Sequence, residues 1–223
     1  MIRVAILMPS CGQRGLANLA RDAIARYTPE VAHDVFLLDH DPWSEEGSAA
    51  NHRALSTLRP RLYGGDDYTH VFIMHDDALP LRSGWLSFLL SKPMPAAAMV
   101  SRRSGRGHSS GTLFMAEMFE WMELAPEMPE YDVAESVPVG WSARTIAWRP
   151  REHDAWALRP RIEPWMALFD CDLSCDDGFA DGAAFYAHLG GGTIGATGTP
   201  PTSRTHRHRV ESWIVAAREE LGL

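Results

Sequence analysis

The chain has few of the features that mark disulfide-rich or membrane-spanning proteins. It contains three cysteines, Cys11, Cys171 and Cys175, and no Cys-x-x-Cys pair, so neither a disulfide framework nor a four-thiolate zinc site is expected. The apolar start of the chain ends after about six residues, which is shorter than a secretory core of ~7–15 residues or a membrane span of ~20. We therefore expect a cytoplasmic protein with no membrane insertion.

A basic surface is also missing, because the formal net charge is −8. Such a charge argues against a broad nucleic-acid-binding face, so nucleic acid is not an expected partner, although a local basic patch remains compatible with it. With 223 residues, 45% of them hydrophobic, the chain is long enough for one domain with a sizeable core.

Two glycine-rich phosphate-binding patterns are absent as well. The stretch Pro-Ser-Cys-Gly-Gln-Arg-Gly after the first apolar run lacks the spacing of a dinucleotide-binding fingerprint, and no GxxxxGK[ST] sequence occurs. The sequence thus excludes the common NAD-binding and P-loop classes.

What is present in the first half is an alternation of strands and helices. Continuous apolar runs at residues 2–10, 33–41 and 68–77 predict buried strands, and residues 14–27 carry Leu16, Leu19, Ala20, Ala23 and Ile24 at helical spacing. Further helices are expected after residue 42 and at 83–91, the latter with Ser83 as N-cap. This order predicts an α/β fold with a mostly parallel sheet flanked by helices.

The second half is less regular. We expect a strand at 96–103, a polar loop at 104–112 that is either a mobile lid or a solvated connection, and a helix at 112–124. One further strand is expected after residue 137, turning at Arg149 and Pro150, followed by a helix at 182–189. Asp170, Asp172 and Asp176 are interpreted as a solvated acidic loop.

Polar residues follow all three predicted strands of the first half, and two of the three strands end in carboxylates. Asp39 and Asp41 follow the second, Asp76 and Asp77 follow the third, and Ser10 and Cys11 follow the first. The carboxyl ends of the strands form the ligand-binding edge of such a sheet. Because oxygen ligands suit hard cations, this edge predicts a site for Mn²⁺ or Mg²⁺ with a phosphate-bearing substrate.

Three segments carry a resemblance to a known family. AILMPSCGQRGLANLARDAI, HDVFLLDHDPWSEEGSAANHRAL and HVFIMHDDALPLRSGWL resemble, in this order, the three elements of family-2-like glycosyltransferases of the GT-A fold, which use nucleotide sugars. His75 occupies the first acidic position of the family's DxD motif, which leaves Asp77 as the metal ligand. The resemblance implies one GT-A-like domain, with a nucleotide-sugar-binding half at 1–103 and a smaller acceptor and catalytic half at 104–223.

The resemblance also implies residue roles. Nucleotide-sugar binding falls to Pro9, Ser10, Cys11, Asp39, Asp41, Asn51 and Asp76, and metal binding to Asp77 with His206 or His208, which share a face if their segment is extended. Asp181, with Asp177 as its rival, is the predicted general base of an inverting transfer. The implied cofactor is Mn²⁺ or Mg²⁺, and the implied donor is a UDP- or GDP-linked sugar, with the acceptor unassigned.

Three other functions remain as alternatives. A nucleotidyltransferase would use the same acidic site, but it carries a basic glycine-rich loop after its first strand, where this chain offers only Arg14. A phosphohydrolase built on His75 and Asp76 would place that pair on a helix. A protein that binds nucleotide sugars without turnover would keep the fold and lose the metal.

Overall fold

The computed structural model describes residues 1–10, 14–39, 56, 68–100, 106–108, 110–121, 138–148, 171–189 and 204–223. In chain order the main elements are β1 (Arg3–Ser10), α1 (Arg14–Tyr27), β2 (Ala32–Asp39), β3 (His70–Ile73), β4 (Ala78–Pro80), α3 (Trp85–Leu90), β5 (Ala96–Ala97), β6 (Thr112–Met115), α4 (Ala116–Trp121), β7 (Trp141–Ser142), β8 (Arg144–Trp148), β9 (Cys171–Cys175), η4 (Ala180–Gly182), β10 (Tyr186–His188) and α6 (Arg204–Leu221). In these ranges no helix is both long and apolar enough to cross a membrane.

The strands form two sheets. The first has the order β2-β1-β3-β6-β5-β7, and the second has the order β4-β10-β9-β8. In the first sheet β1 pairs in parallel with both β2 and β3, β5 pairs in parallel with β7, and β6 runs antiparallel between β3 and β5. The α/β fold with a mostly parallel sheet flanked by helices is therefore confirmed.

Strand β1 is buried on both faces, as its continuous apolar sequence predicts. Val4, Ile6 and Met8 pack into the core beneath α1 and α3, while Ala5 and Leu7 point to the opposite core with Phe114. Alternate residues of a strand point to opposite faces, so a sheet covered on both sides needs apolar residues at every position.

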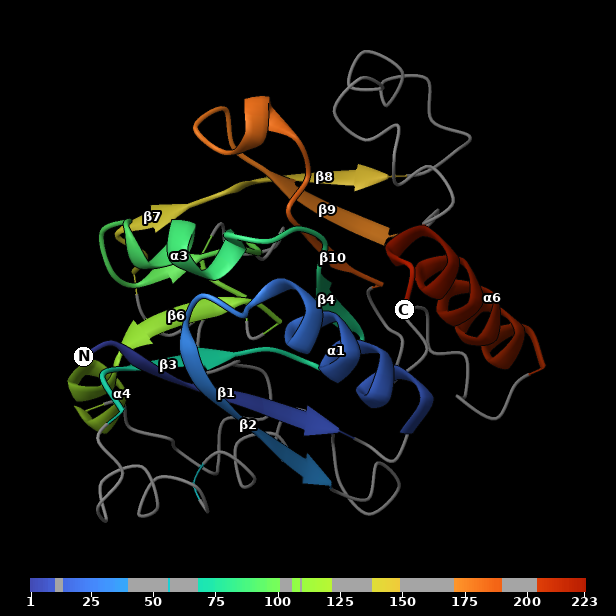
Figure 1. Ribbon diagram of the computed structural model, residues 1–223, viewed down its shortest axis with the longest axis horizontal. Helices are drawn as coiled ribbons and strands as arrows, with labels where there is room; N and C mark the ends of the chain where they lie inside the picture. Colours follow the sequence, from blue (N-terminus) through green and yellow to red (C-terminus); the bar gives the residue numbers. More distant parts are fainter. Residues whose placement is uncertain are drawn as a thin grey trace.

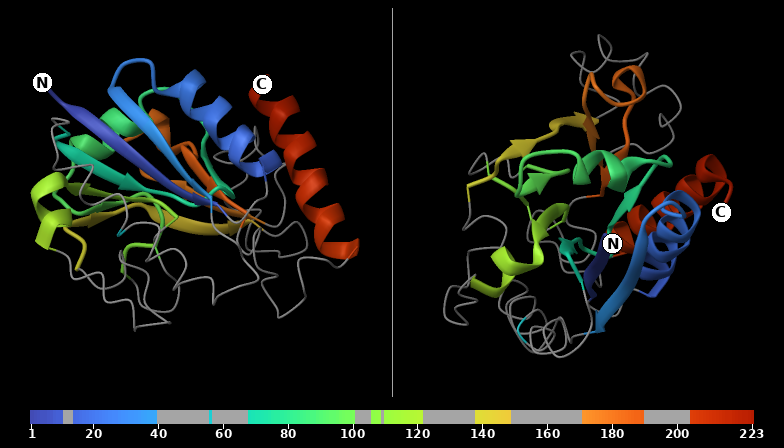
Figure 2. Two further views of the ribbon diagram at one scale, coloured as in Figure 1. Left: turned by 90° about the horizontal axis from the view of Figure 1, so that it is seen from below. Right: turned by 60° about the vertical axis from the view of Figure 1, so that its left-hand side comes forward.

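Helix α1 joins the two sheets. Its predicted bounds are confirmed, and the five apolar residues at helical spacing are all at most 1% exposed. Ala20 faces the first sheet, whereas Leu16 and Leu19 face β4 and α6. Figures 1 and 2 show α6 lying alongside α1, where Arg218 pairs with Asp22 at 2.8 Å. The C-terminal helix thus covers the outer side of the second sheet.

Several expected elements are corrected by the structure. Helix α3 is capped by Gly84, whose φ of 82° turns the chain into the helix, and Ser83 makes no cap. Residues 112–115 are strand β6, so the helix α4 begins only at Ala116. The single strand expected after residue 137 is two strands, β7 and β8, which belong to different sheets. At the expected strand 96–103, only β5 is found among the residues described there.

The largest correction concerns residues 182–189, which were expected to be helical. They enter strand β10, which pairs antiparallel with both β4 and β9. Both sheets consequently take strands from either side of residue 103. The division into a donor half and an acceptor half stays a prediction.

At the N-terminal ends of β1 and β2, one carboxylate holds several groups together. Asp34 accepts hydrogen bonds from Tyr68 Oη at 2.8 Å and from Arg3 Nη2 at 2.7 Å. The hydrogen bond from Tyr68, together with those from Arg3 and its charge, lowers the pKa of Asp34. Because this pKa is depressed in the folded state, the contribution to stability is present above the unfolded pKa of about 3.9 and disappears as the pH falls through the folded value.

We therefore expect Asp34→Asn to lower the free energy of unfolding at pH 7 by about 0.5–1 kcal/mol, a modest loss because both partners are partly exposed. Urea unfolding at pH 7 and near pH 3 would measure it, with the difference from wild type shrinking at the lower pH. Tyr68→Phe is the matched variant, which removes one hydrogen bond and keeps the charge. A difference that is the same at both pH values would contradict the assignment.

Candidate functional site

Two adjacent carboxylates lie where the chain passes from the first sheet to the second. Asp76 and Asp77 follow β3 and precede β4, in a turn closed by a hydrogen bond from Ala78 N to His75 O. Their exposed fractions are 1% and 2%. Burying a carboxylate costs several kcal/mol unless hydrogen bonds or opposite charge compensate it, so the partners of these two residues define the site.

The partner of Asp76 is Ser10, at the carboxyl end of the neighbouring parallel strand. Ser10 Oγ donates to Asp76 Oδ2 at 2.8 Å, across 66 residues of sequence. Ser10 is also in register with Asp39 on β2. The expected meeting of strand ends at one sheet edge is therefore confirmed for Ser10 and Asp76, and for the backbone of Asp39. Pro9 lies in β1, whereas Cys11, Asp41 and Asn51 lie outside the described residues.

Asp77 faces a histidine that the sequence did not indicate. His188 Nε2 lies 3.3 Å from Asp77 Oδ1. The pairing of β10 with β4 sets this contact, because His188 is opposite Ala78 and Leu189 N donates to Asp77 O at 2.9 Å. His188 was missed because its segment was expected to be helical.

Ser110 connects His188 to His75. Its hydroxyl oxygen lies 3.0 Å from His75 Nδ1 and 3.0 Å from His188 Nε2. Since one hydroxyl has a single proton, it donates to one ring and accepts from the other. Ser110 is fully buried, so the expectation of a solvated or mobile loop at 104–112 is wrong for this part of it.

Tyr186 holds the backbone of Ser110 in place from the core side. Its hydroxyl donates to Ser110 O at 2.5 Å, and the ring is completely buried against Trp85 and Phe72. Burial, with the negative charge of Asp77 adding to it, raises the pKa of Tyr186 well above its ordinary value. Tyr186 therefore stays neutral and remains a hydrogen-bond donor.

His75, Asp77 and His188 form a group that fits a metal ion. Their potential ligand atoms all lie within 4.8 Å of one another. The 3.3 Å between Asp77 Oδ1 and His188 Nε2 exceeds the roughly 2.7–2.9 Å of a charge-assisted hydrogen bond. Ligand bonds of about 2.1 Å at right angles place neighbouring ligand atoms about 3 Å apart, which is close to this spacing. Two imidazoles beside one carboxylate favour a first-row transition metal over Mg²⁺.

Of the other predicted metal ligands, His208 is not part of this group, and the side chain of His206 lies outside the described part of the structure. His206 and His208 lie in the first turns of α6, and the side chain of His208 is exposed. The segment is helical rather than extended, so residues two apart do not share a face. His75, which the sequence presented as a departure from the acidic motif, belongs to the group instead.

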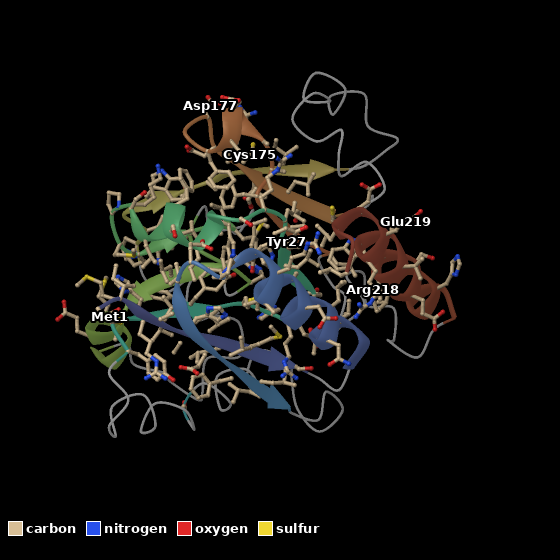
Figure 3. The ribbon with its side chains drawn as sticks, viewed as in Figure 1. Met1, Tyr27, Cys175, Asp177, Arg218 and Glu219 are labelled. Atoms are coloured by element: carbon tan, nitrogen blue, oxygen red, sulfur yellow. The ribbon has the colours of Figure 1, made fainter. Side chains whose placement is uncertain are left out.

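The two predicted base residues occupy the turn between β9 and β10, at the end of β10 opposite His188. Asp177 and Asp181 are both exposed, and Figure 3 shows Asp177 at the edge of the molecule, beyond Cys175. Asp181 has a φ of 57°, following Ala180 at 44°. Positive φ at two successive non-glycine residues is strained, which is a feature that clusters at functional sites. Their catalytic role stays a prediction.

A third carboxylate, that of Asp172, lies closer in strand register to the metal-capable group of His75, Asp77 and His188 than Asp177 and Asp181 do. It is directly opposite His188 in the pairing of β9 with β10. Opposed residues of antiparallel strands share a face, with Cβ atoms about 4.5–5.5 Å apart. Asp172 is half-buried in β9, so its interpretation as part of a solvated loop is wrong. Asp170 lies outside the described residues.

Comparison of this chain with known proteins finds similarity of fold only. No protein-family model matches the chain, and no curated protein matches it. Among solved structures, a Drosophila β-1,4-galactosyltransferase 7 variant in complex with manganese, UDP-Gal and xylobiose aligns over 55% of this chain and 52% of its own, at 17% identity and a TM-score of 0.37.

Two further structures are similar at comparable levels. The apo form of the glycosyltransferase GlyE from Streptococcus pneumoniae aligns over 100% of this chain and 64% of its own, at 12% identity and a TM-score of 0.47. A protein from STIV aligns over 60% of this chain and 74% of its own, at 11% identity and a TM-score of 0.36. The chain thus spans less than two thirds of either glycosyltransferase structure. At such identities, a likeness concerns the fold and assigns no activity.

A metal titration tests the group directly. At Mn²⁺ about 100-fold above its dissociation constant, we expect the free energy of unfolding of the wild type to rise by about 2.7 kcal/mol. His188→Asn and Asp77→Asn should each remove most of this increment, since each removes a ligand. His70→Asn is the matched control, because His70 begins β3 at the end opposite His75. Equal increments in all four proteins would show that the metal binds elsewhere.

Proposed function

We propose that the protein transfers a sugar from a nucleoside diphosphate sugar to an acceptor hydroxyl, with a divalent metal as cofactor. The observation that supports this most directly is the group of half-buried His75 with buried Asp77 and His188, which lies beside the carboxyl ends of parallel strands β1 and β3. Ligands of open α/β sheets bind at this edge. A nucleotide diphosphate offers the oxygens that a metal at this position would require.

In this proposal, the residues at the carboxyl ends of β1 and β2 bind the nucleoside, and the group of His75, Asp77 and His188 binds the metal. Pro9, Ser10 and the Asp39 backbone border the space beyond β1 and β2, where the base and ribose would lie, with Cys11, Asp41 and Asn51 as further candidates. Asp76 holds Ser10 in place through their hydrogen bond. Asp77, His75 and His188 would hold the metal, which, when bound, supplies positive charge to the leaving diphosphate.

The chemical step exchanges one bond for another at the anomeric carbon. The acceptor oxygen forms a bond to this carbon while the bond to the diphosphate oxygen breaks, and the hydroxyl proton passes to a base. If the base lies on the face opposite the leaving group, the configuration inverts. A carboxylate within hydrogen-bond reach of the acceptor is therefore required.

A donor panel tests the proposal before the acceptor is known. We expect one class among UDP-, GDP-, ADP-, CMP- and dTDP-sugars to raise the melting temperature in the presence of Mn²⁺ and not in EDTA, because a ligand that binds only the folded state stabilises it. Asp77→Asn should abolish the response and leave the metal-free melting profile cooperative. No response to any donor would refute the transferase proposal, whereas binding without sugar release would favour a non-catalytic nucleotide-sugar-binding protein.

Asp172, Asp177 and Asp181 are the three candidates for the general base. Replacing each of them by asparagine distinguishes between them. Release of the sugar to water, with the responding donor and Mn²⁺, gives a readout that needs no acceptor. We expect Asp172→Asn to lower this rate about 100-fold with donor affinity unchanged, since general-base catalysis contributes that order of magnitude and Asp172 shares a face with His188. Asp177→Asn and Asp181→Asn are the matched variants. A loss confined to either of them would assign the base to the β9–β10 turn.

A further inference from the structure

The side chain of Ser110 faces the metal-capable group directly. Its Oγ lies 3.0 Å from His75 Nδ1 and 3.0 Å from His188 Nε2. Ser110 is fully buried, so bulk water does not replace either nitrogen as a partner of the hydroxyl. Whatever binds these two nitrogens therefore determines what the hydroxyl oxygen contacts.

His188 Nε2 has two oxygen atoms beside it. Asp77 Oδ1 lies 3.3 Å from this nitrogen, and Ser110 Oγ lies 3.0 Å from it. The lone pair or the proton of a ring nitrogen points along a single line in the plane of the ring. Two oxygen atoms at such similar distances cannot both lie on that line, because they would overlap. An ion on the line, between the two oxygens, would contact both of them.

The spacing of these atoms suits shared coordination of one ion. Ligand bonds of about 2.1 Å at right angles place neighbouring ligand atoms about 3 Å apart. The separations of Ser110 Oγ from the two histidine nitrogens, and that of Asp77 Oδ1 from His188 Nε2, are all close to this value. Hydrogen bonds have similar lengths, so the distinction between the two depends on the protons.

Metal binding would take both histidine nitrogens away from the hydroxyl. In the metal-free arrangement, Ser110 Oγ donates to one ring and accepts from the other. A nitrogen that binds a metal carries no proton and has no lone pair left, so it neither donates to the hydroxyl nor accepts from it. A buried hydroxyl that loses both partners is unfavourable. Binding of its oxygen to the same ion would compensate that loss.

The backbone of Ser110 keeps the hydroxyl beside the histidines. Ser110 N donates to His108 Nδ1 at 3.1 Å, and Ser110 O accepts from Tyr186 Oη at 2.5 Å. At the next residue, a Cβ on Gly111 would meet Tyr186 Cε1 at 2.9 Å, so the chain there is already packed against the ring. The side chain of Ser110 can therefore rotate about its Cα–Cβ bond, but its backbone is held on both sides.

We propose that Ser110 Oγ is a fourth protein ligand of the metal ion, together with Asp77, His75 through Nδ1 and His188 through Nε2. The inference deepens the proposed function, because it rests on the metal centre and adds a neutral oxygen ligand to it. Four protein atoms leave about two positions of a six-coordinate ion. Two oxygens of a nucleoside diphosphate would fill these positions.

The first test compares Mn²⁺ binding by wild type, Ser110→Ala and Thr112→Val. We expect calorimetry to show about tenfold weaker binding by Ser110→Ala. Loss of a residue that only orients the ligands costs a similar factor, so the relaxation of solvent protons by the bound ion is measured as well. It should rise about 1.5-fold in Ser110→Ala, because three waters replace two on the ion. Thr112→Val should match the wild type in both measurements, since it removes a buried hydroxyl that donates to His108 O instead.

The second test replaces the oxygen of Ser110 by sulfur. A thiol that binds a metal loses its proton, and thiolate ligands suit softer metals than Mn²⁺. We expect Co²⁺ bound to Ser110→Cys to show a thiolate-to-cobalt charge-transfer band in the near ultraviolet. The wild type with Co²⁺ is the control for the other cysteines of the chain and should lack the band.

The outcomes separate this inference from the proposed function. Unchanged proton relaxation in Ser110→Ala, or no band from Co²⁺ bound to Ser110→Cys, would overturn the inference while the metal centre stands. Tighter Mn²⁺ binding by Ser110→Ala would also overturn it, since the hydroxyl would then compete with the ion for the histidines. If Ser110→Cys does not fold, the relaxation measurement decides. Absence of Mn²⁺ binding to the wild type would refute both the inference and the metal-dependent function, whereas a wild type that binds Mn²⁺ and no nucleotide sugar would refute the transferase alone.

Discussion

The burial of two adjacent carboxylates is the constraint on which the rest of this structure depends. Asp76 and Asp77 lie at the junction of two sheets with almost no exposed surface, and water cannot offset the cost of their charge there. Each is compensated from a different direction, Asp76 by Ser10 of β1 and Asp77 by His188 of β10. The two sheets must therefore meet at this turn, and the meeting point becomes the site.

Compensation of the carboxylates also explains the polar groups further inside. Ser110 contacts both histidines through its hydroxyl, and Tyr186 holds the carbonyl of Ser110 from within the core. The hydroxyls of Ser110 and Tyr186 and the carbonyl of Ser110 all have hydrogen-bond partners, which is what a low-dielectric interior demands. A network satisfied in this way loses little mobility on binding a ligand, because its side chains are already held by packing and hydrogen bonds.

The sequence predicts the parts of the site that depend on local patterns. The alternating faces of β1 and the helical spacing of α1 follow from residues within one segment, and parallel strands then bring Ser10 to Asp76. His188 could not be predicted in this way. Residues 182–189 are apolar or aromatic at nearly every position, which fits a buried strand and a buried helix equally. Its place is decided by β4, more than 100 residues earlier, and a three-residue strand carries little signal of its own.

The same non-local pairing determines where a proton acceptor can lie. Residues of β10 are spaced about 3.3 Å apart along the strand, so the turn that carries Asp177 and Asp181 is separated from His188 by the length of β10. Asp172 has no such separation, because the register that places His188 beside Asp77 also places Asp172 beside His188. A group bound beside His75, Asp77 and His188 would therefore have the carboxylate of Asp172 on the same face of the second sheet. In the proposed transfer, the turn at Asp181 would contact only an acceptor long enough to extend along β10.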